Sequence, residues 1–226
     1  MRRILKAGTM DEPASAGRGH CGFTLVEALV VVAIIGVIAA LLLPSLARGK
    51  ETAKVARVRA ELYGIGLALD MYAADYEGHI PPVRVNCNTD LRSDWCELPV
   101  ELANQRYLPH SYQGGLEADL EDVFNPNHTY KYAAPGPQLL NGSPTANYAL
   151  WAPTNLATMS GGGRYFTDPK LSPIRWVVWS LGPRPDSAKA QDTYAPLNRE
   201  SWYTHTGDTG VIARYADSQG TQFLTH

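Results

Sequence analysis

The sequence predicts an α+β fold in which a small antiparallel sheet packs on the second half of a long N-terminal helix. An apolar run from Phe23 to Leu43 predicts the first half of that helix, and apolar residues at spacings of three and four predict the second half. Four later segments rich in Tyr, Trp, Val and Ile predict strands. A long helix followed by strands favours an arrangement in which the sheet buries the apolar stripe of the helix.

The apolar run has the length of a membrane-spanning helix. Its 21 residues contain one charge, Glu27, and at about 1.5 Å per residue they span a bilayer core of roughly 30 Å. Pro44 follows, which can kink the helix but need not end it. In the preceding segment basic residues outnumber acidic ones, with Arg2, Arg3, Lys6 and Arg18 against Asp11 and Glu12. A positive flank indicates the cytoplasmic side, so we expect a single pass with the C-terminal domain outside the cytoplasm.

Two other interpretations of this run fit less well. A secretory signal peptide ending at residues 45–47 would have an uncharged apolar core of about 7 to 15 residues. The run is longer than that and contains Glu27. A lipoprotein anchor at Cys21 would need the apolar stretch before the cysteine, whereas here the stretch follows it.

The chain after Pro44 predicts an amphipathic continuation of the same helix to about residue 77. Charged residues occupy the other faces, and Gly78 supplies an end signal. Only three heptads are present and 148 residues follow, which disfavours a free-standing coiled coil. The apolar stripe consists of Val55, Val58, Leu62, Ile65, Leu69, Tyr72 and Tyr76.

The rest of the chain predicts short strands separated by loops. Gly or Pro clusters bound the segments of high β propensity. The stretches "GPQLLNGSP" (136–144) and "MSGGGRYFTDP" (159–169) are predicted to be surface loops. The predicted strands are Thr129–Ala133, Asn147–Ala152, Ile174–Leu181 and Gly210–Tyr215.

Composition and motifs disfavour nucleic-acid binding and catalysis. The net charge of −2 leaves no basic footprint for nucleic acid. The glycines 161–163 lack the Lys-Ser/Thr of a phosphate-binding loop, and the six histidines show no metal-ligand spacing. Ser201 and His205 lack the glycine pattern of a nucleophile elbow. We therefore expect a protein that is not an enzyme.

The stretch "GFTLVEALVVVAII" resembles the cleavage and methylation motif of type IV prepilins and type II secretion pseudopilins. The resemblance implies that a prepilin peptidase cuts after Gly22 and methylates the new amino terminus at Phe23. Residues 1–22 would then be a cytoplasmic leader, 23–44 the transmembrane and assembly helix, and 45–226 a periplasmic domain. The implied fold is the type IV pilin fold.

The motif also suggests a role for the charge inside the apolar run. A carboxylate at membrane depth is costly and needs a partner or a function. The resemblance implies that Glu27 attracts the cationic amino terminus of Phe23 in a neighbouring subunit as helices stack into a filament, because pairing offsets the desolvation of both charges. The alternative is that Glu27, four residues from the membrane edge, snorkels to the surface.

Further patches are similar to the major pseudopilins, up to about Asp192. They are "LALDMYAADYEGHIPP", "LANQRYLP", "DVFNPNHTYKYAAPG" and "WVVWSLGPRPD". The resemblance implies a structural subunit that polymerises from the bacterial inner membrane and drives export of folded proteins. Its implied partners are membrane lipid, other pseudopilins and the inner-membrane secretion platform. The alternatives are a type IV pilin or minor pilin for adhesion or motility, and a membrane-anchored ligand-binding ectodomain.

The cysteine count agrees with the implied cleavage. Removal of the leader takes away Cys21 and leaves Cys87 and Cys96 as a pair. We expect a disulfide between them, since the implied compartment is oxidising. Two free thiols are the alternative, and a metal site is disfavoured because no second Cys or His pair accompanies "CNTDLRSDWC".

One segment suggests a metal ion. In the major pseudopilins the loop that corresponds to "SLGPRPDSAKAQD" wraps a calcium ion, and hard oxygen ligands on an irregular loop suit Ca²⁺. The resemblance implies carboxylate ligands from Asp186 and Asp192 and a backbone oxygen from Ser180 or Leu181. The chain departs from the pattern by the insertion of residues 184 and 185 before the first aspartate. Solvated turn aspartates are the alternative.

Overall fold

The computed structural model of the chain describes residues 23–87, 90, 92–93, 95–108, 120–156, 159, 162–185 and 197–225. The chain divides into two compact units, with the boundary between Pro44 and Ser45. Both units contain part of one helix, and all strands of the described residues lie in the second unit.

The helix α1 runs from Leu25 to Asp75, 51 residues that include Pro44. The prediction that Pro44 does not end the helix is therefore confirmed. The chain leaves the helix at Gly78, whose backbone N–H donates to the Ala73 carbonyl at 2.7 Å and whose φ is +85°. This is the left-handed conformation that glycine adopts without strain at helix ends, so the predicted end signal is confirmed.

The first unit contains the apolar part of α1. All of its described residues are exposed, and its most apolar 18-residue window has a mean hydropathy of 2.9 with none of its residues buried. Among the described residues this is the one helix long and apolar enough to cross a membrane, judged by length and composition alone. An apolar surface of this size has to be covered by lipid or by protein.

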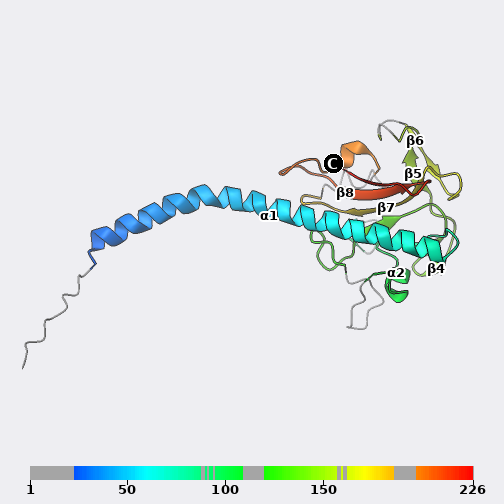
Figure 1. Cartoon of the computed structure of the whole chain (residues 1–226), viewed down its shortest axis with the longest axis horizontal. Coiled ribbons are helices and arrows are strands. Elements are labelled where there is room, and N and C mark those ends of the chain that lie inside the picture. The colour runs from blue at the N-terminus through cyan, green and yellow to red at the C-terminus, as the bar shows by residue number, and fades with distance from the viewer. Residues whose placement is uncertain are drawn as a thin grey trace, which may run out of the picture. The chain divides into compact units, whose positions relative to one another are not determined.

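The second unit places the apolar stripe of α1 against a four-stranded sheet (Figure 1). The sheet has the order β2-β7-β8-β9 and all of its pairs are antiparallel. Five predicted stripe residues are buried, whereas Tyr72 is half-buried and Tyr76 lies exposed beyond the helix end. The strands are β2 (Lys131–Ala133), β7 (Ile174–Ser180), β8 (Ile212–Asp217) and β9 (Gln222–Leu224).

Gly66 permits the close contact between helix and sheet. A Cβ at this position would lie 2.9 Å from Cη2 of Trp176 and 2.7 Å from Oε1 of Gln222. Trp176 is fully buried, and its strand β7 lies between β2 and β8 in the sheet. A side chain at residue 66 would therefore push α1 away from the core.

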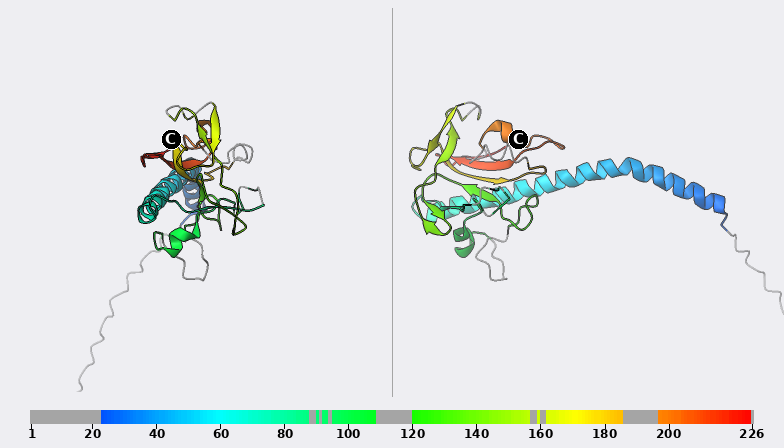
Figure 2. Two further views of the ribbon diagram at one scale, coloured as in Figure 1. Left: turned by 90° about the vertical axis from the view of Figure 1, so that its right-hand side faces the viewer. Right: turned by 180° about the vertical axis from the view of Figure 1, so that it is seen from behind.

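Among the described residues, two smaller sheets and two short helices complete the second unit. Figure 2 shows it from two further sides. In both views the β5–β6 hairpin lies on the side of the four-stranded sheet that faces away from α1, and α2 lies on the other side. In the three-stranded sheet β1 pairs with β3 in parallel and β3 pairs with β4 antiparallel. The elements are β1 (Val83–Val85), α2 (Val100–Asn104), β3 (Gln138–Leu140), β4 (Ser143–Pro144), β5 (Leu150–Pro153), β6 (Gly163–Phe166) and the 3₁₀ helix η1 (Arg199–Ser201).

The α+β prediction is confirmed, and the arrangement is consistent with the type IV pilin fold. The four predicted strands are present as β2, β5, β7 and β8, with bounds shifted by up to three residues. Two predictions are wrong, because both expected loops contain strands. In 136–144, Asn141 and Gly142 have φ values of +48° and +81°, which makes a two-residue turn of the type that joins strands. In 159–169, β6 forms because Trp151 of β5 pairs with Tyr165 across the turn.

Candidate functional site

The start of α1 carries a reciprocal set of hydrogen bonds between Thr24 and Glu27. The Thr24 backbone N–H and hydroxyl donate to Oε2 of Glu27 at 2.8 and 2.7 Å, and the Glu27 N–H donates to the Thr24 hydroxyl at 3.2 Å. This is a capping box, which satisfies two N–H groups that a helix start otherwise leaves without partners. The carboxylate therefore has partners inside its own chain, in addition to the intersubunit role that the resemblance implies.

Sequence reasoning overlooked Thr24, although the T-x-x-E spacing signals a capping box. Phe23, the predicted first residue of the processed chain, is 72% exposed and directly precedes Thr24. The geometry therefore holds the carboxylate beside the point where a cleaved chain would begin. Gly22, the predicted cleavage residue, lies outside the described residues.

The second unit contains a buried carboxylate at the end of β7. Asp122 is 1% exposed, and its Oδ1 accepts from the Ser180 hydroxyl at 2.8 Å and from the Phe124 N–H at 3.0 Å. Its Oδ2 accepts from the Leu181 N–H at 3.1 Å. Burial raises the pKa of Asp122, and these three donors act against that rise. The carboxylate thus ties the loop before β2 to the end of β7.

These bonds engage the side-chain hydroxyl of Ser180 and the backbone N–H of Leu181, whereas the predicted calcium ligand is a backbone oxygen of Ser180 or Leu181. The Ser180 hydroxyl donates to Asp122 and accepts from the Gly182 N–H at 3.2 Å, so the hydroxyl oxygen is already engaged, and the predicted backbone oxygen is not affected by these bonds. The other two predicted ligands, Asp186 and Asp192, lie outside the described residues. Within the described part of the chain, no three His, Cys, Asp or Glu side chains gather in a way that could hold a metal ion. Calcium binding therefore stays a prediction.

Arg184, which sequence analysis treated only as an insertion, makes a bidentate ion pair with Glu51 of α1. Its Nη2 lies 2.7 Å from Oε2 and its Nη1 3.3 Å from Oε1, and Nη1 also donates to the Asp208 carbonyl at 3.1 Å. The Gly207 N–H donates to Oε1 of the same glutamate at 2.9 Å and is the main cause of the lowered pKa of Glu51. The pair connects two loops of the second unit to its helix, which no local sequence signal indicated.

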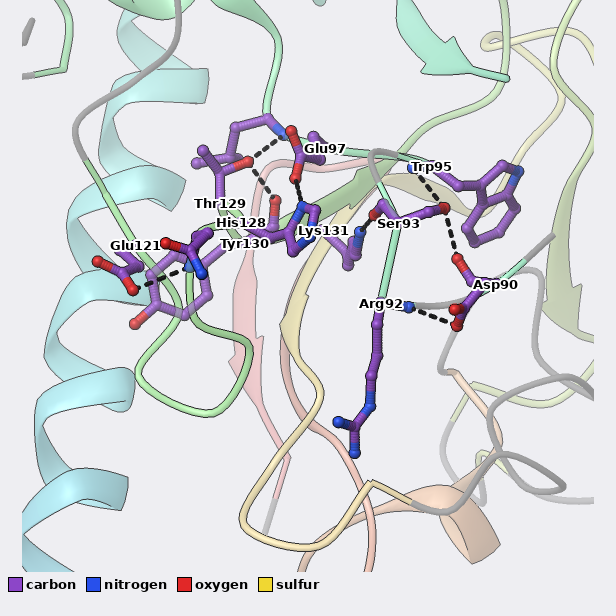
Figure 3. A network of polar contacts seen from close by, with 12 residues as sticks. Asp90, Arg92, Ser93, Trp95, Glu97, Glu121, His128, Thr129, Tyr130 and Lys131 are labelled. Atoms are coloured by element: carbon purple, nitrogen blue, oxygen red, sulfur yellow. Dashed lines mark hydrogen bonds and ion pairs between the residues drawn. The ribbon is translucent and has the colours of Figure 1, made fainter. Parts of the chain in front are cut away.

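A polar network joins residues 90–97 to residues 121–131 (Figure 3). Lys131 is 1% exposed and donates from Nζ to the Ser93 carbonyl. Nδ1 of His128 lies 2.8 Å from Oε1 of Glu97, and the Leu98 N–H donates to the Thr129 hydroxyl at 3.1 Å. These bonds satisfy buried polar groups beside β2, so we interpret the network as structural.

The described loop around His205 lacks the geometry of an activated nucleophile. The Thr204 hydroxyl donates to Oδ2 of Asp208 at 2.7 Å and lies 2.8 Å from Nδ1 of His205, so its proton points at the carboxylate and not at the imidazole. Ser201 is buried in η1. In general acid–base catalysis a base has to accept the proton of the nucleophile. This loop therefore offers no support for catalysis.

The expected disulfide between Cys87 and Cys96 is absent from the structure, where both cysteines have free thiols. Cys96 is fully buried, with its Sγ 3.9 Å from the Tyr148 hydroxyl. Cys87 is exposed after the end of β1, and Nδ2 of Asn141 donates to its Sγ at 3.7 Å. The physical reason for the difference is that one thiol lies inside the core and the other at the surface, with a separate partner each.

We predict that the two thiols alkylate at very different rates in the folded chain. Burial raises the pKa of Cys96 to about 12, and the thiolate is the reactive species, so Cys87 should react at least about a hundredfold faster at pH 8. Mass spectrometry of peptides after timed iodoacetamide treatment measures both rates, and in denaturant the rates should become equal. Protection of both residues until a reductant is added would instead show a disulfide.

Comparisons with known proteins match the amino end of the chain. A family model described as the prokaryotic N-terminal methylation motif matches residues 17–43. The type II secretion system core protein G of Pseudomonas aeruginosa is 43% identical over 58 residues, which cover 26% of this chain and 41% of the relative. The core protein G of Klebsiella pneumoniae is 46% identical over 54 residues, and that of Escherichia coli K12 is 44% identical over 54 residues.

These matches are partial on both sides. The two shorter ones cover 24% of this chain and 39% and 37% of the relatives, so the chain spans about two fifths of the length of the curated relatives it matches. No solved structure is significantly similar. The matched family motif includes Phe23, Thr24 and Glu27, the residues at the helix start.

Proposed function

We propose that the chain is a pseudopilin of the type II secretion system, of the major, G-type class, which polymerises from the bacterial inner membrane to drive export of folded proteins. The observation that carries the proposal is the methylation motif at residues 17–43, which opens an unbroken 51-residue helix. The similarity to core protein G of several bacteria supports the same class. The expected partners are a prepilin peptidase, other pseudopilins, the inner-membrane platform, membrane lipid and further copies of the chain.

The helix start provides the chemistry for assembly. Cleavage after Gly22 would create a cationic amine at Phe23, next to the capping box of Thr24 and Glu27. A carboxylate held at this depth would attract the amine of a neighbouring subunit, and the pair would offset the cost of removing both charges from water. Each subunit would thus present one positive and one negative group at the start of an apolar helix.

The proposed function includes a calcium ion bound by oxygen atoms of this chain. Asp186 and Asp192 would supply carboxylates, and Ser180 or Leu181 would supply a backbone oxygen, since the Ser180 hydroxyl is engaged by Asp122. Bound calcium would add a hard cation, which prefers oxygen ligands of this kind. Asp122 and Arg184 hold the start of that loop through their own hydrogen bonds.

We predict that Gly22→Val prevents processing. A branched side chain at the residue before the cut crowds the peptidase, so the variant should accumulate in the membrane as the uncut precursor. Intact-mass spectrometry of the membrane fraction should show N-methylated Phe23 as the first residue of the wild type and the full leader on the variant. A Gly22→Ala variant, with a smaller side chain, serves as the matched control and should be cut at least in part.

A wild-type chain that keeps its leader would contradict the proposal. So would a chain that begins after Ala47, because that start is expected from a secretory signal peptide.

A further inference from the structure

Cations without an ion-pair partner among the described residues follow directly after the apolar run. Arg48 and Lys50 come five and seven residues after Leu43, and both are exposed on α1. Lys54 follows, half-buried, with its Nζ 5.7 Å from the centre of the Phe124 ring. In the described part of the chain, no acidic side chain forms an ion pair with any of these three residues, which we call the juxtamembrane cations.

Two neighbouring charges of α1, Arg57 and Glu51, are already paired. Nε of Arg57 lies 2.7 Å from Oε1 of Glu61, one helical turn further on. Glu51 is the acidic residue closest in sequence to the juxtamembrane cations. Its Oε2 forms an ion pair with Nη2 of Arg184 at 2.7 Å. The segment 48–54 thus carries three positive charges whose one acidic neighbour is neutralised by a loop of the second unit. From the sequence alone, the negative charge of Glu51 would be expected to offset one of these positive charges.

The positions of these cations around the helix favour contact with a layer of lipid headgroups over contact with a single protein partner. At about 100° per residue, Lys50 lies about 200° around the helix from Arg48, on the opposite side. At about 1.5 Å per residue, both lie within about 11 Å of Leu43 along a helix, where long basic side chains reach phosphates of the headgroup layer. A protein partner would contact one side of the helix, whereas headgroups surround it.

The distribution of charge along the chain also needs an explanation. Lys and Arg are usually concentrated on the cytoplasmic flank of a membrane helix. Here the leader has four such residues in 22, whereas the opposite flank has five within residues 48–59. Basic residues on the far flank run against the usual bias, so a favourable interaction on that side would account for them.

We propose that Arg48 and Lys50, with Lys54 as an outer contribution, bind the phosphates of anionic phospholipids in the leaflet that faces the second unit. The orientation rests on the proposed function, but the lipid contact does not require a filament. A Lys or Arg close to an anionic surface raises membrane affinity about fivefold, and the effect falls off within a Debye length. In the assembly cycle these contacts oppose extraction of the subunit from the bilayer.

The test uses the full chain in nanodiscs that contain equal amounts of phosphatidylglycerol and phosphatidylcholine. Native mass spectrometry counts the lipids that stay bound when the chain is released. The wild type should retain phosphatidylglycerol in preference, and Arg48→Gln with Lys50→Gln should reduce that preference by about an order of magnitude, about fivefold or less for each charge. Lys54→Gln alone should reduce it less, because Lys54 lies further from the apolar run.

Arg57→Gln is the matched control. It removes one positive charge from the same helix, but from a side chain that Glu61 already neutralises, so the lipid preference should stay as in the wild type. The exchange of Arg48→Lys with Lys50→Arg should also preserve it. Equal retention of the two lipids by the wild type would overturn the proposal, as would a preference that survives the double substitution. Either result would indicate that these residues bind a protein partner and not lipid. A failure to form filaments would contradict the proposed function but not the lipid contact.

Discussion

Glu27→Ala should reduce filament formation on the order of tenfold or more while membrane insertion and cleavage continue. Removal of a charge makes the helix more apolar, so insertion becomes more favourable. Assembly would lose the group that pairs with the amino terminus of a neighbouring subunit, and that amine would then stay without a partner in an apolar environment. Electron microscopy and sedimentation of sheared filaments measure assembly, and intact-mass spectrometry measures cleavage in the same cells.

The capping box allows the charge of Glu27 to be separated from its local role. Glu27→Gln keeps an oxygen that can accept from the Thr24 N–H but removes the charge, because Gln also serves at this capping position. Thr24→Val keeps the charge and removes the hydroxyl that donates to the carboxylate. If intersubunit charge pairing drives assembly, Glu27→Gln should fail as Glu27→Ala does, and Thr24→Val should assemble better than either.

Normal filaments from Glu27→Gln would contradict the charge-pairing role and leave helix capping as the function of residue 27. Thr24→Ser restores a hydroxyl at the same position and is the control for Thr24→Val. It should assemble as the wild type does, because serine caps helices at least as well as threonine.

Asp122→Ala should lower the free energy of unfolding by about 3 kcal/mol, the largest loss we expect from a single change in the second unit. The substitution leaves three donors without an acceptor, the Ser180 hydroxyl and the N–H groups of Phe124 and Leu181. Each buried donor left unsatisfied costs about 1 to 3 kcal/mol. Relief of the desolvated carboxylate, which is the main cause of the raised pKa of Asp122, offsets part of that sum.

Urea unfolding of the full chain in detergent, followed by the fluorescence of the buried Trp176 and Trp179, measures this loss. Ser180→Ala removes one of the three bonds to Asp122 and also the acceptor of the Gly182 N–H, so it should cost about 2 kcal/mol. Asp122→Asn should fall between the two, because its oxygen can still accept while its amide group opposes the Leu181 N–H. An Asp122→Ala variant as stable as the wild type would show that water replaces the carboxylate and that the tie to β7 is dispensable.

The sequence by itself determined the features that depend on near neighbours in the chain. The apolar run, the stripe from Val55 to Leu69 and the end at Gly78 follow from helical spacing and backbone preference, which are readable within a few turns. The strand β7 is rich in β-forming residues over seven positions and was predicted for the same reason. The capping box of Thr24 and Glu27 is equally local, and its spacing could have been recognised.

Only the tertiary structure decided the contacts between distant segments. Asp122 and Ser180 are 58 residues apart, and Glu51 and Arg184 are 133 residues apart, so no local pattern shows that they meet. The strands β1 and β9 have three residues each and exist because a partner strand supplies their hydrogen bonds. The burial of Cys87 and Cys96 also depends on the tertiary structure, since packing places the Cys96 thiol in the core and leaves the Cys87 thiol at the surface. Spacing along the chain determines which face of an element a residue occupies. The fold determines which groups of distant segments meet, and the hydrogen-bond partners of buried polar atoms therefore depend on the fold.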